Sequence, residues 1–152
     1  MKFAYTLVSL ASLFILNSCN SGPTENSALN TKTSESDSVY NLCYSSLVKK
    51  DTVLLNALMF GDSIKGSLGY KLYEKEQKNG LILGKMYGDT LRALYTFMAG
   101  DSQFINEISF LRDDTLLTEG LGDRVLKGGK FVFTDNKKVQ FKGLELVKSK
   151  CK

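Results

Sequence analysis

Residues 63–74 read SIKGSLGYKLYE, and their apolar side chains stand at every second position. Ile64, Leu68 and Tyr70 share one side of this stretch, whereas charged and hydroxyl side chains occupy the other. Successive side chains of a β-strand point to opposite faces, so this alternation predicts a strand with one face in a core and the other in water.

The same alternation recurs along the chain. Residues 91–97 and 104–110 repeat it, and their core-facing positions are Leu91, Ala93, Tyr95, Phe97, Phe104, Ile108 and Phe110. Shorter strands are expected at residues 39–46, 53–60, 81–87, 115–119, 130–133, 138–141 and 144–148. No clear helical periodicity follows the N-terminal segment, so the sequence predicts an all-β fold.

Short turn signals separate these strands. A Gly-Asp pair followed by a hydroxyl residue occurs at residues 61–63, 88–90 and 100–102. Glycine tolerates positive φ, and aspartate or serine can bond backbone amides in a tight reversal. Residues 78–80 (Lys-Asn-Gly) and 127–129 (Lys-Gly-Gly) are expected to be further turns. We predict an antiparallel β-meander that closes into a small barrel of about 8–10 short strands, and an open sandwich fits the same pattern.

The first residues have the pattern of an export signal. Lys2 is the only charged residue before Glu25, and residues 3–16 are largely apolar but too short for a stable membrane span. The run Leu16-Asn17-Ser18-Cys19 follows and resembles the lipobox of bacterial lipoproteins. The resemblance implies that residues 1–18 are a signal-peptide helix. It also implies that Cys19 becomes the N-terminus, with diacylglycerol on its thiol and an acyl chain such as palmitate on its amine.

The lipobox resemblance also implies a location. Several acyl chains, each contributing about 0.8 kcal/mol per buried methylene, hold a protein on a bilayer. In the sorting rule of such lipoproteins, aspartate after the modified cysteine retains the protein at the inner membrane. Asn20 stands there instead, so the bacterial outer membrane is expected, on either its periplasmic leaflet or the cell surface. Residues 19–37 are polar enough to form a disordered tether, and residues 38–152 have the size of one domain.

The same resemblance implies how the two remaining cysteines are used. With Cys19 lipidated, Cys43 and Cys151 are left as a pair in an oxidising compartment, so a disulfide is expected. Closing a loop of about 100 residues stabilises a fold by up to roughly 4.7 kcal/mol in the chain-entropy model. The bond would bring together the first and last strands, which suits a closed barrel.

The composition argues against several chemistries. The sequence has no histidine, which removes Ser-His-Asp and Cys-His nucleophile systems and the commonest zinc ligand. Its glycines form no phosphate-binding motif, so neither a cofactor nor a metal is expected. The carboxylate pairs Glu74 with Glu76 and Asp113 with Asp114 are expected in solvated turns. The chain is therefore expected not to be an enzyme, and a histidine-independent envelope enzyme is the alternative.

The charge of the chain is modest and unevenly distributed. The formal net charge of +4 is not typical of a nucleic-acid-binding protein. After Leu126 the sequence contains eight lysines but only two acidic residues, Asp135 and Glu145. This stretch would meet anionic headgroups or an acidic partner, or it would simply be a solvated face.

The barrel interior offers the remaining candidate site. Aromatic residues at alternating positions would line a pocket for a small apolar ligand, with a charged residue near its rim. The same residues would otherwise simply fill the core. The candidate residues are Tyr70, Tyr95, Phe97, Phe104 and Phe110 as the lining, and Arg92 or Glu107 at the rim.

The domain also resembles known envelope proteins. Gly-Asp-Thr-Leu at 88–91, Tyr-Thr-Phe at 95–97, Glu119-Gly120 and a terminal cysteine resemble small bacterial lipoproteins, and the outline is similar to lipocalin-like or META-type barrels. The resemblance implies a membrane-anchored binding or interaction module. Its partner would be an envelope protein or a small apolar ligand, and the oligomeric state is open.

Overall fold

The computed structural model describes residues 38–48 and 50–151, which belong to one compact unit. The expected signal peptide, Cys19 and linker lie outside the described residues. All structural statements below therefore concern the domain expected from residue 38 onward.

The described residues form ten β-strands and one short 3-10 helix, which confirms the all-β prediction. Among residues 38–48 and 50–151, no helix is long and apolar enough to cross a membrane. The elements are β1 (Val39–Val48), β2 (Asp51–Phe60), β3 (Ser63–Lys71), β4 (Lys78–Tyr87), β5 (Thr90–Ala99), β6 (Ser102–Asp113), β7 (Leu116–Leu121), β8 (Arg124–Lys127), β9 (Lys130–Phe133), η1 (Asn136–Lys138) and β10 (Gln140–Lys148).

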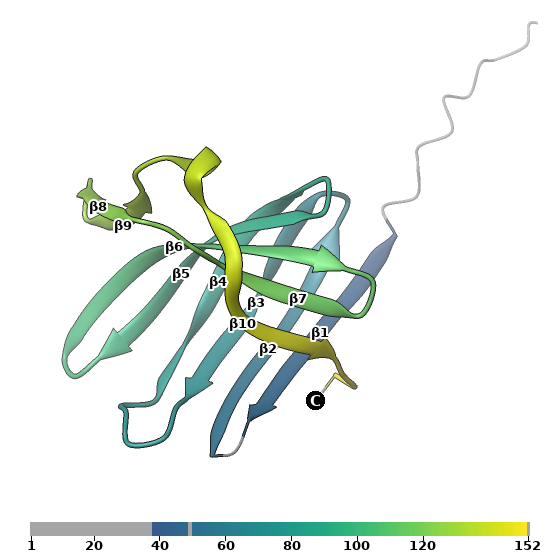
Figure 1. Ribbon diagram of the computed structural model, residues 1–152, viewed down its shortest axis with the longest axis horizontal. Helices are drawn as coiled ribbons and strands as arrows, with labels where there is room; N and C mark the ends of the chain where they lie inside the picture. Colours follow the sequence, from purple (N-terminus) through teal and green to yellow (C-terminus); the bar gives the residue numbers. More distant parts are fainter. Residues whose placement is uncertain (1–37, 49, 152) are drawn as a thin grey trace, which may run out of the picture. The chain divides into compact units, whose positions relative to one another are not determined.

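Eight of these strands close into an antiparallel barrel (Figure 1). The strand order is β5-β4-β3-β2-β1-β10-β7-β6, and β6 pairs with β5 to complete the ring. Strands β1 to β7 form the predicted meander, because each pairs with the next. Strand β10 then inserts between β1 and β7. The closed barrel is confirmed, and the open sandwich is wrong.

The hairpin of β8 and β9 lies outside this ring. It meets the barrel through one parallel pair, Asn106 of β6 with Phe131 of β9. The carboxylate of Glu107 also accepts a hydrogen bond from the backbone N–H of Phe133 at 2.8 Å. Strand β9 was predicted from the sequence, but β8 was not, because all its side chains are exposed and give no alternation.

The three Gly-Asp pairs turn the hairpins as predicted. Gly61, Gly88 and Gly100 have φ values of 54°, 58° and 56°, in the left-handed region that favours glycine. Each occupies the first position of a two-residue connection between paired strands. These turns fix the register, and therefore fix which side chains face inward.

The predicted turn at residues 78–80 is wrong, because these residues begin β4. Gly80 faces the interior, where a Cβ atom would lie 2.7 Å from Cε2 of Tyr95 and 2.8 Å from Cβ of Phe97. The glycine thus makes room for aromatic rings, and the chain reverses earlier, at residues 72–77. The strand expected at residues 138–141 is also wrong in part, because Lys138 ends η1.

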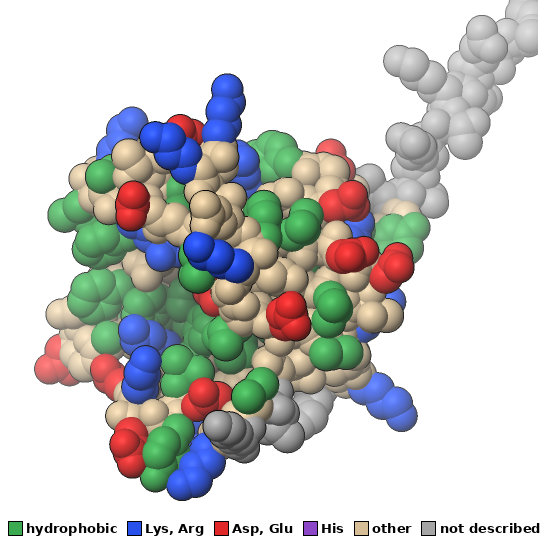
Figure 2. Space-filling model, in the orientation of Figure 1, with side chains coloured by type: hydrophobic (Ala, Val, Ile, Leu, Met, Phe, Trp, Pro, Cys, Tyr) green, Lys and Arg blue, Asp and Glu red, His purple; other side chains and the backbone are tan. Residues whose placement is uncertain are grey.

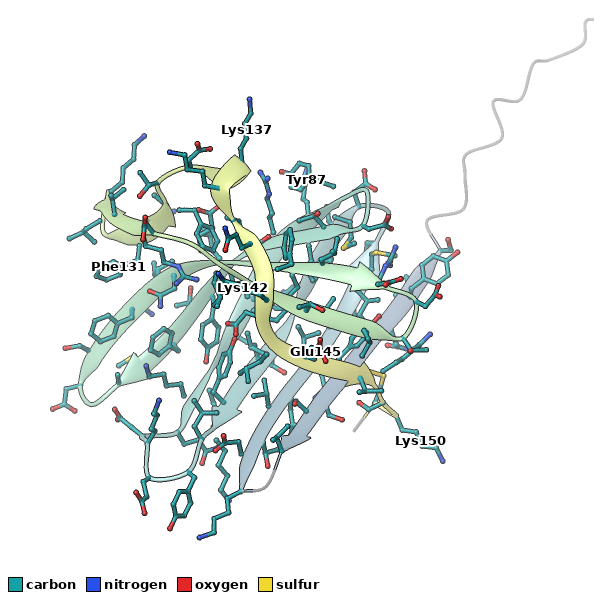
Figure 3. The ribbon with its side chains drawn as sticks, in the orientation of Figure 1. Tyr87, Phe131, Lys137, Lys142, Glu145 and Lys150 are labelled. Carbon is teal, nitrogen blue, oxygen red and sulfur yellow. A yellow bond between two sulfur atoms is a disulfide. The ribbon has the colours of Figure 1, made fainter. Side chains whose placement is uncertain are left out.

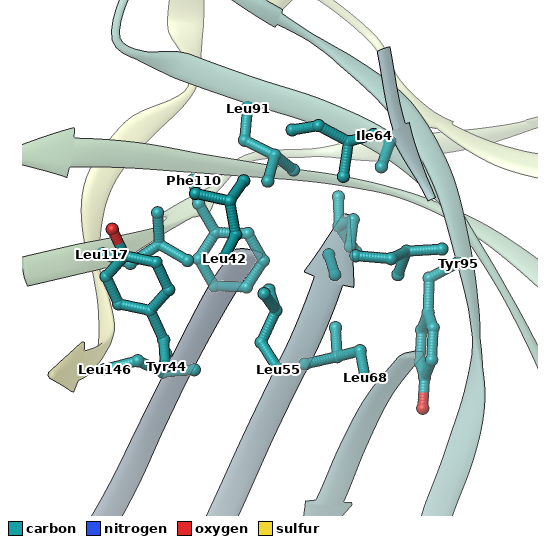
Figure 4. Packing of buried hydrophobic residues seen from close by; sticks show 14 of the residues in the cluster. Leu42, Tyr44, Leu55, Ile64, Leu68, Leu91, Tyr95, Phe110, Leu117 and Leu146 are labelled. Carbon is teal, nitrogen blue, oxygen red and sulfur yellow. The ribbon is translucent and has the colours of Figure 1, made fainter. Parts of the chain in front are cut away.

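The inward positions fill the barrel with aliphatic and aromatic side chains (Figure 4). Two glycine–alanine pairs let adjacent strands approach each other closely: Gly66 of β3 pairs with Ala57 of β2, and Gly84 of β4 pairs with Ala93 of β5. A methyl group on either glycine would collide with the backbone of the facing strand. Both glycines lie within strands and permit close approach of the neighbouring strand, as the sequence suggested.

The barrel closes along a short seam between its first and last strands. Strand β1 pairs with β10 at Tyr44 and Ser45, but it pairs with β2 along its whole length. The disulfide between Cys43 and Cys151 lies beside this seam, with the Cα atoms 5.2 Å apart and a separation of 108 positions in the sequence. The N–H of Ser149 also donates to the carbonyl oxygen of Cys43 at 2.8 Å. The predicted disulfide is confirmed.

Because the covalent bond reinforces a short seam, its loss should weaken the whole barrel. We predict that the double variant Cys43→Ser/Cys151→Ser lowers the free energy of unfolding by about 2–5 kcal/mol in a denaturant titration. The oxidised and reduced wild-type proteins provide a matched control, since reduction should give a similar loss. Equal midpoints for oxidised and reduced protein would contradict the proposed importance of the seam.

Candidate ligand-binding site

A pocket opens between one end of the barrel and the β8–β9 hairpin. Its volume is about 320 Å³, near the lower limit of the roughly 300–1,000 Å³ usual for small-molecule sites. Figure 2 shows a hollow on this face with hydrophobic side chains inside it, and Figure 3 shows Phe131 on the hairpin beside it. The lining residues are Lys78, Phe97, Ala99, Phe104, Asn106, Arg124 and Phe131.

A row of aromatic rings runs from the pocket into the barrel. Phe104 and Phe97 are stacked with their centroids 5.7 Å apart, and Phe97 stacks on Tyr95 at 4.8 Å. Tyr70 meets Tyr95 edge to face at 5.9 Å. All four occupy inward positions of β3, β5 and β6, so the strand alternation itself aligns them. Phe104 remains 36% exposed, which leaves ring surface for a ligand.

The two tyrosines of this row act as hydrogen-bond donors. The hydroxyl of Tyr95 donates to the carbonyl oxygen of Lys78 at 3.0 Å, and the hydroxyl of Tyr70 donates to Oε1 of Glu119 at 3.1 Å. Burial raises the pKa of Tyr95 to about 12. Burial, and then the neighbouring Glu119 carboxylate, raises the pKa of Tyr70 above its ordinary value. Both hydroxyls therefore keep their protons at neutral pH.

Glu119 reaches the interior because of the local shape of β10. Strand β7 points Leu117 and Glu119 to the same side, and the pairing of β7 with β10 is interrupted between Phe141 and Glu145. Gly143 lies in this irregularity, where a Cβ atom would come within 2.9 Å of Cβ of Glu119. The glycine thus leaves room for the carboxylate beside Tyr70.

Two cationic side chains stand at the pocket. The ammonium nitrogen of Lys78 lies 5.3 Å from the ring centroid of Phe97. The Nε–H of Arg124 donates to the carbonyl oxygen of Glu107 at 3.2 Å, and its guanidinium lies 4.5 Å from the ring centroid of Phe133. Neither cation forms an ion pair within residues 38–48 and 50–151. The apolar rings are thus accompanied by positive charge.

The residues predicted from the sequence fall into three groups. Phe97 and Phe104 line the pocket, and Tyr70 and Tyr95 continue the aromatic row behind them. Phe110 instead has no exposed surface and belongs to the core.

The two predicted rim residues do not line the pocket. Arg92 lies between the inward-facing residues Leu91 and Ala93 and therefore on the outer wall, 5.6 Å from the ring centroid of Tyr87. Glu107 lies on the outer face of β6, where its carboxylate binds the backbone of β9. Both residues alternate with core-facing neighbours, so strand geometry turns them away from the interior.

Sequence reasoning missed five lining residues. Lys78, Ala99 and Asn106 share the parity of inward-facing positions, which was a usable signal. Arg124 and Phe131 had no comparable signal, because their hairpin folds back on the barrel from outside the ring.

Other charged groups are more dispersed. Glu74 and Asp114 have positive φ in turns, and Glu76 accepts a hydrogen bond from the N–H of Gly100. Figure 3 shows Lys137, Lys142 and Lys150 spread along the C-terminal segment. In the part of the chain that the structure describes, no group of three or more Cys, Asp or Glu residues could hold a metal ion.

Comparison of the chain with protein-family models, curated proteins and solved structures gave no match.

The raised pKa of Tyr95 predicts a loss of stability in alkali. The unfolded chain releases the hydroxyl proton near pH 10, whereas the folded protein holds it until about pH 12, so this contribution is present below pH 10 and disappears as the pH rises through that interval. The stability advantage of wild type over Tyr95→Phe should therefore shrink by about 2 kcal/mol between pH 9 and pH 11.5.

Denaturant titrations at each pH measure this difference. The variant Ile82→Val serves as the control, because it removes one buried methylene and no titratable group. The difference in the free energy of unfolding between Ile82→Val and wild type should not depend on pH. If the Tyr95→Phe difference is equally constant, burial of Tyr95 has no effect on its ionisation.

Proposed function

We propose that this chain is a lipid-anchored protein of the bacterial outer membrane and that its barrel is a non-catalytic binding module for a small ligand with an apolar body. The observation that carries the proposal is the pocket of about 320 Å³ that opens onto the stacked rings of Phe97 and Phe104. Rings in a fully packed interior would have no free surface. Here Phe104 and Phe131 are 36% and 37% exposed at the same opening.

The polar groups around the pocket favour binding over catalysis. Tyr95 and Tyr70 are committed as donors to fixed acceptors and keep their protons at neutral pH. The sequence contains no histidine that could exchange a proton near neutrality. A preformed apolar pocket with a few polar groups is instead the usual form of a small-molecule site.

The anchor rests on the lipobox at residues 16–19, and the disulfide supports the compartment. Disulfides persist in oxidising environments such as the bacterial periplasm and the cell surface. The bond between Cys43 and Cys151 leaves Cys19 as the remaining cysteine of the chain. A thioether-linked lipid at that position would hold the barrel at a membrane surface.

The first test addresses the pocket. The neutral fluorophore N-phenyl-1-naphthylamine should bind saturably to a chain that begins at residue 20, which avoids the acyl chains and keeps the whole compact unit. Ala99→Phe should weaken binding at least about tenfold, because the added ring occupies the pocket.

The control for this test is Leu81→Ser on the outer wall, where Leu81 is 67% exposed. This variant should bind the fluorophore like wild type. Absence of saturable binding, or a larger effect of Leu81→Ser than of Ala99→Phe, would rule out the pocket as a ligand site.

The second test addresses the anchor. In cells that express the full chain, wild-type protein should sediment with outer membranes, and its N-terminal peptide should carry lipid on Cys19 by mass spectrometry. Cys19→Ala should abolish both, whereas Cys43→Ser should still be lipidated. An unmodified Cys19 in membrane-extracted protein would disprove the anchor.

A further inference from the structure

The charged groups that line the pocket have one sign. Lys78 is the first residue of β4, and it shares the inward parity of Gly80 and Ile82. Its ammonium group therefore stands at the barrel end over Phe97, 5.3 Å from the ring centroid. Arg124 comes from β8, so two different elements contribute the cations that line this opening.

Hydrogen bonding holds Arg124 in place but does not use all its donors. The Nε–H is taken by the carbonyl oxygen of Glu107, and a guanidinium has further N–H donors on its two terminal nitrogens. Lys78 carries three donors on one ammonium group. An anionic group between these side chains would receive charge-assisted hydrogen bonds, which are stronger than neutral ones.

A third polar group in the pocket lacks a partner. Oδ1 of Asn106 is buried and accepts no hydrogen bond from any residue that the structure describes. Buried polar atoms are nearly always paired, and leaving one unpaired costs free energy. Asn106 lines the pocket, so this carboxamide is a polar group next to the aromatic rings.

The nearby carboxylates are engaged elsewhere. Glu119 lies behind Tyr70, accepts its hydroxyl proton in a hydrogen bond, and does not line the pocket. Glu107 faces the outer wall and binds the N–H of Phe133. Glu76 binds the N–H of Gly100. The charge that faces a ligand in the pocket is therefore positive.

We propose that the ligand is a small aromatic acid, whose flat body lies against Phe97, Phe104 and Phe131 and whose anionic group lies between Lys78 and Arg124. Three aromatic side chains at one opening favour a planar partner, because offset stacking gains more than area burial alone. This inference rests on the proposed binding function and adds the chemical class of the ligand.

The experiment compares two competitors of the same shape. 2-Naphthoate and its uncharged analogue 2-naphthamide are each titrated against bound N-phenyl-1-naphthylamine at pH 7.5. Naphthoate should displace the fluorophore at a concentration about tenfold lower than the amide, and this ratio should decrease as salt is raised from 20 to 500 mM. The salt series needs no variant, so it holds even if a substitution harms folding.

Variants then assign the effect to the two cations. Lys78→Gln/Arg124→Gln should bring the ratio of the naphthoate and naphthamide concentrations close to one, because both cations are removed. The matched control is Lys138→Gln/Lys142→Gln, which removes the same charge from a different pocket.

The outcomes separate this inference from the proposed function. If the fluorophore does not bind, the proposed function fails. If it binds but naphthamide competes as well as naphthoate, the pocket is a binding site and the acid is the wrong ligand class. Stronger competition by a cationic analogue such as 2-naphthylmethylammonium would also contradict an acidic ligand. So would a control variant in which the preference for naphthoate over naphthamide falls as much as in Lys78→Gln/Arg124→Gln.

Discussion

The short seam between β1 and β10 is the constraint on which the rest of the barrel depends. Strands β1 to β7 each pair with the next strand in the chain, and this includes the pairing of β5 with β6. The first and last strands, β1 and β10, share few backbone pairs. The covalent bond from Cys43 to Cys151 holds them together. Strand β10 also pairs with β7, and β7 carries Glu119 to Tyr70. The strand closed by the seam is thus the neighbour of the strand that supplies the interior carboxylate.

The interior itself has two chemically different parts. Around Phe110 the buried side chains are mainly aliphatic, and Tyr44 lies among them. Towards the pocket the row from Tyr70 to Phe104 brings hydroxyl groups that need acceptors, which the Lys78 carbonyl and Glu119 supply. The first part accounts for stability, and the second leaves ring surface and positive charge at an opening. The division follows the strand direction, because each inward position lies at a fixed height in the barrel.

The sequence was enough to predict which residues form the barrel wall, but not which residues line the pocket. Alternation placed Ile64, Leu68, Tyr95 and Phe97 on the inner face, since period-2 burial leaves a direct trace in the residue order. Arg92 and Glu107 were wrongly expected at the rim because they were chosen for their charge, although the alternation placed them on the outer face. Gly80 was interpreted as a turn because its role depends on rings from another strand. Arg124 and Phe131 belong to a hairpin whose docking is a tertiary contact, and no local pattern reports it.

The position of the β8–β9 hairpin has a consequence for how such a protein can diversify. The hairpin contributes Arg124 and Phe131 to the pocket but no strand to the closed ring. In the proposed binding module, residue replacements in this hairpin would change the wall of the pocket while the strand pairing of the closed ring is kept. Part of the pocket wall is thus encoded in a surface ribbon that is not one of the strands of the closed ring.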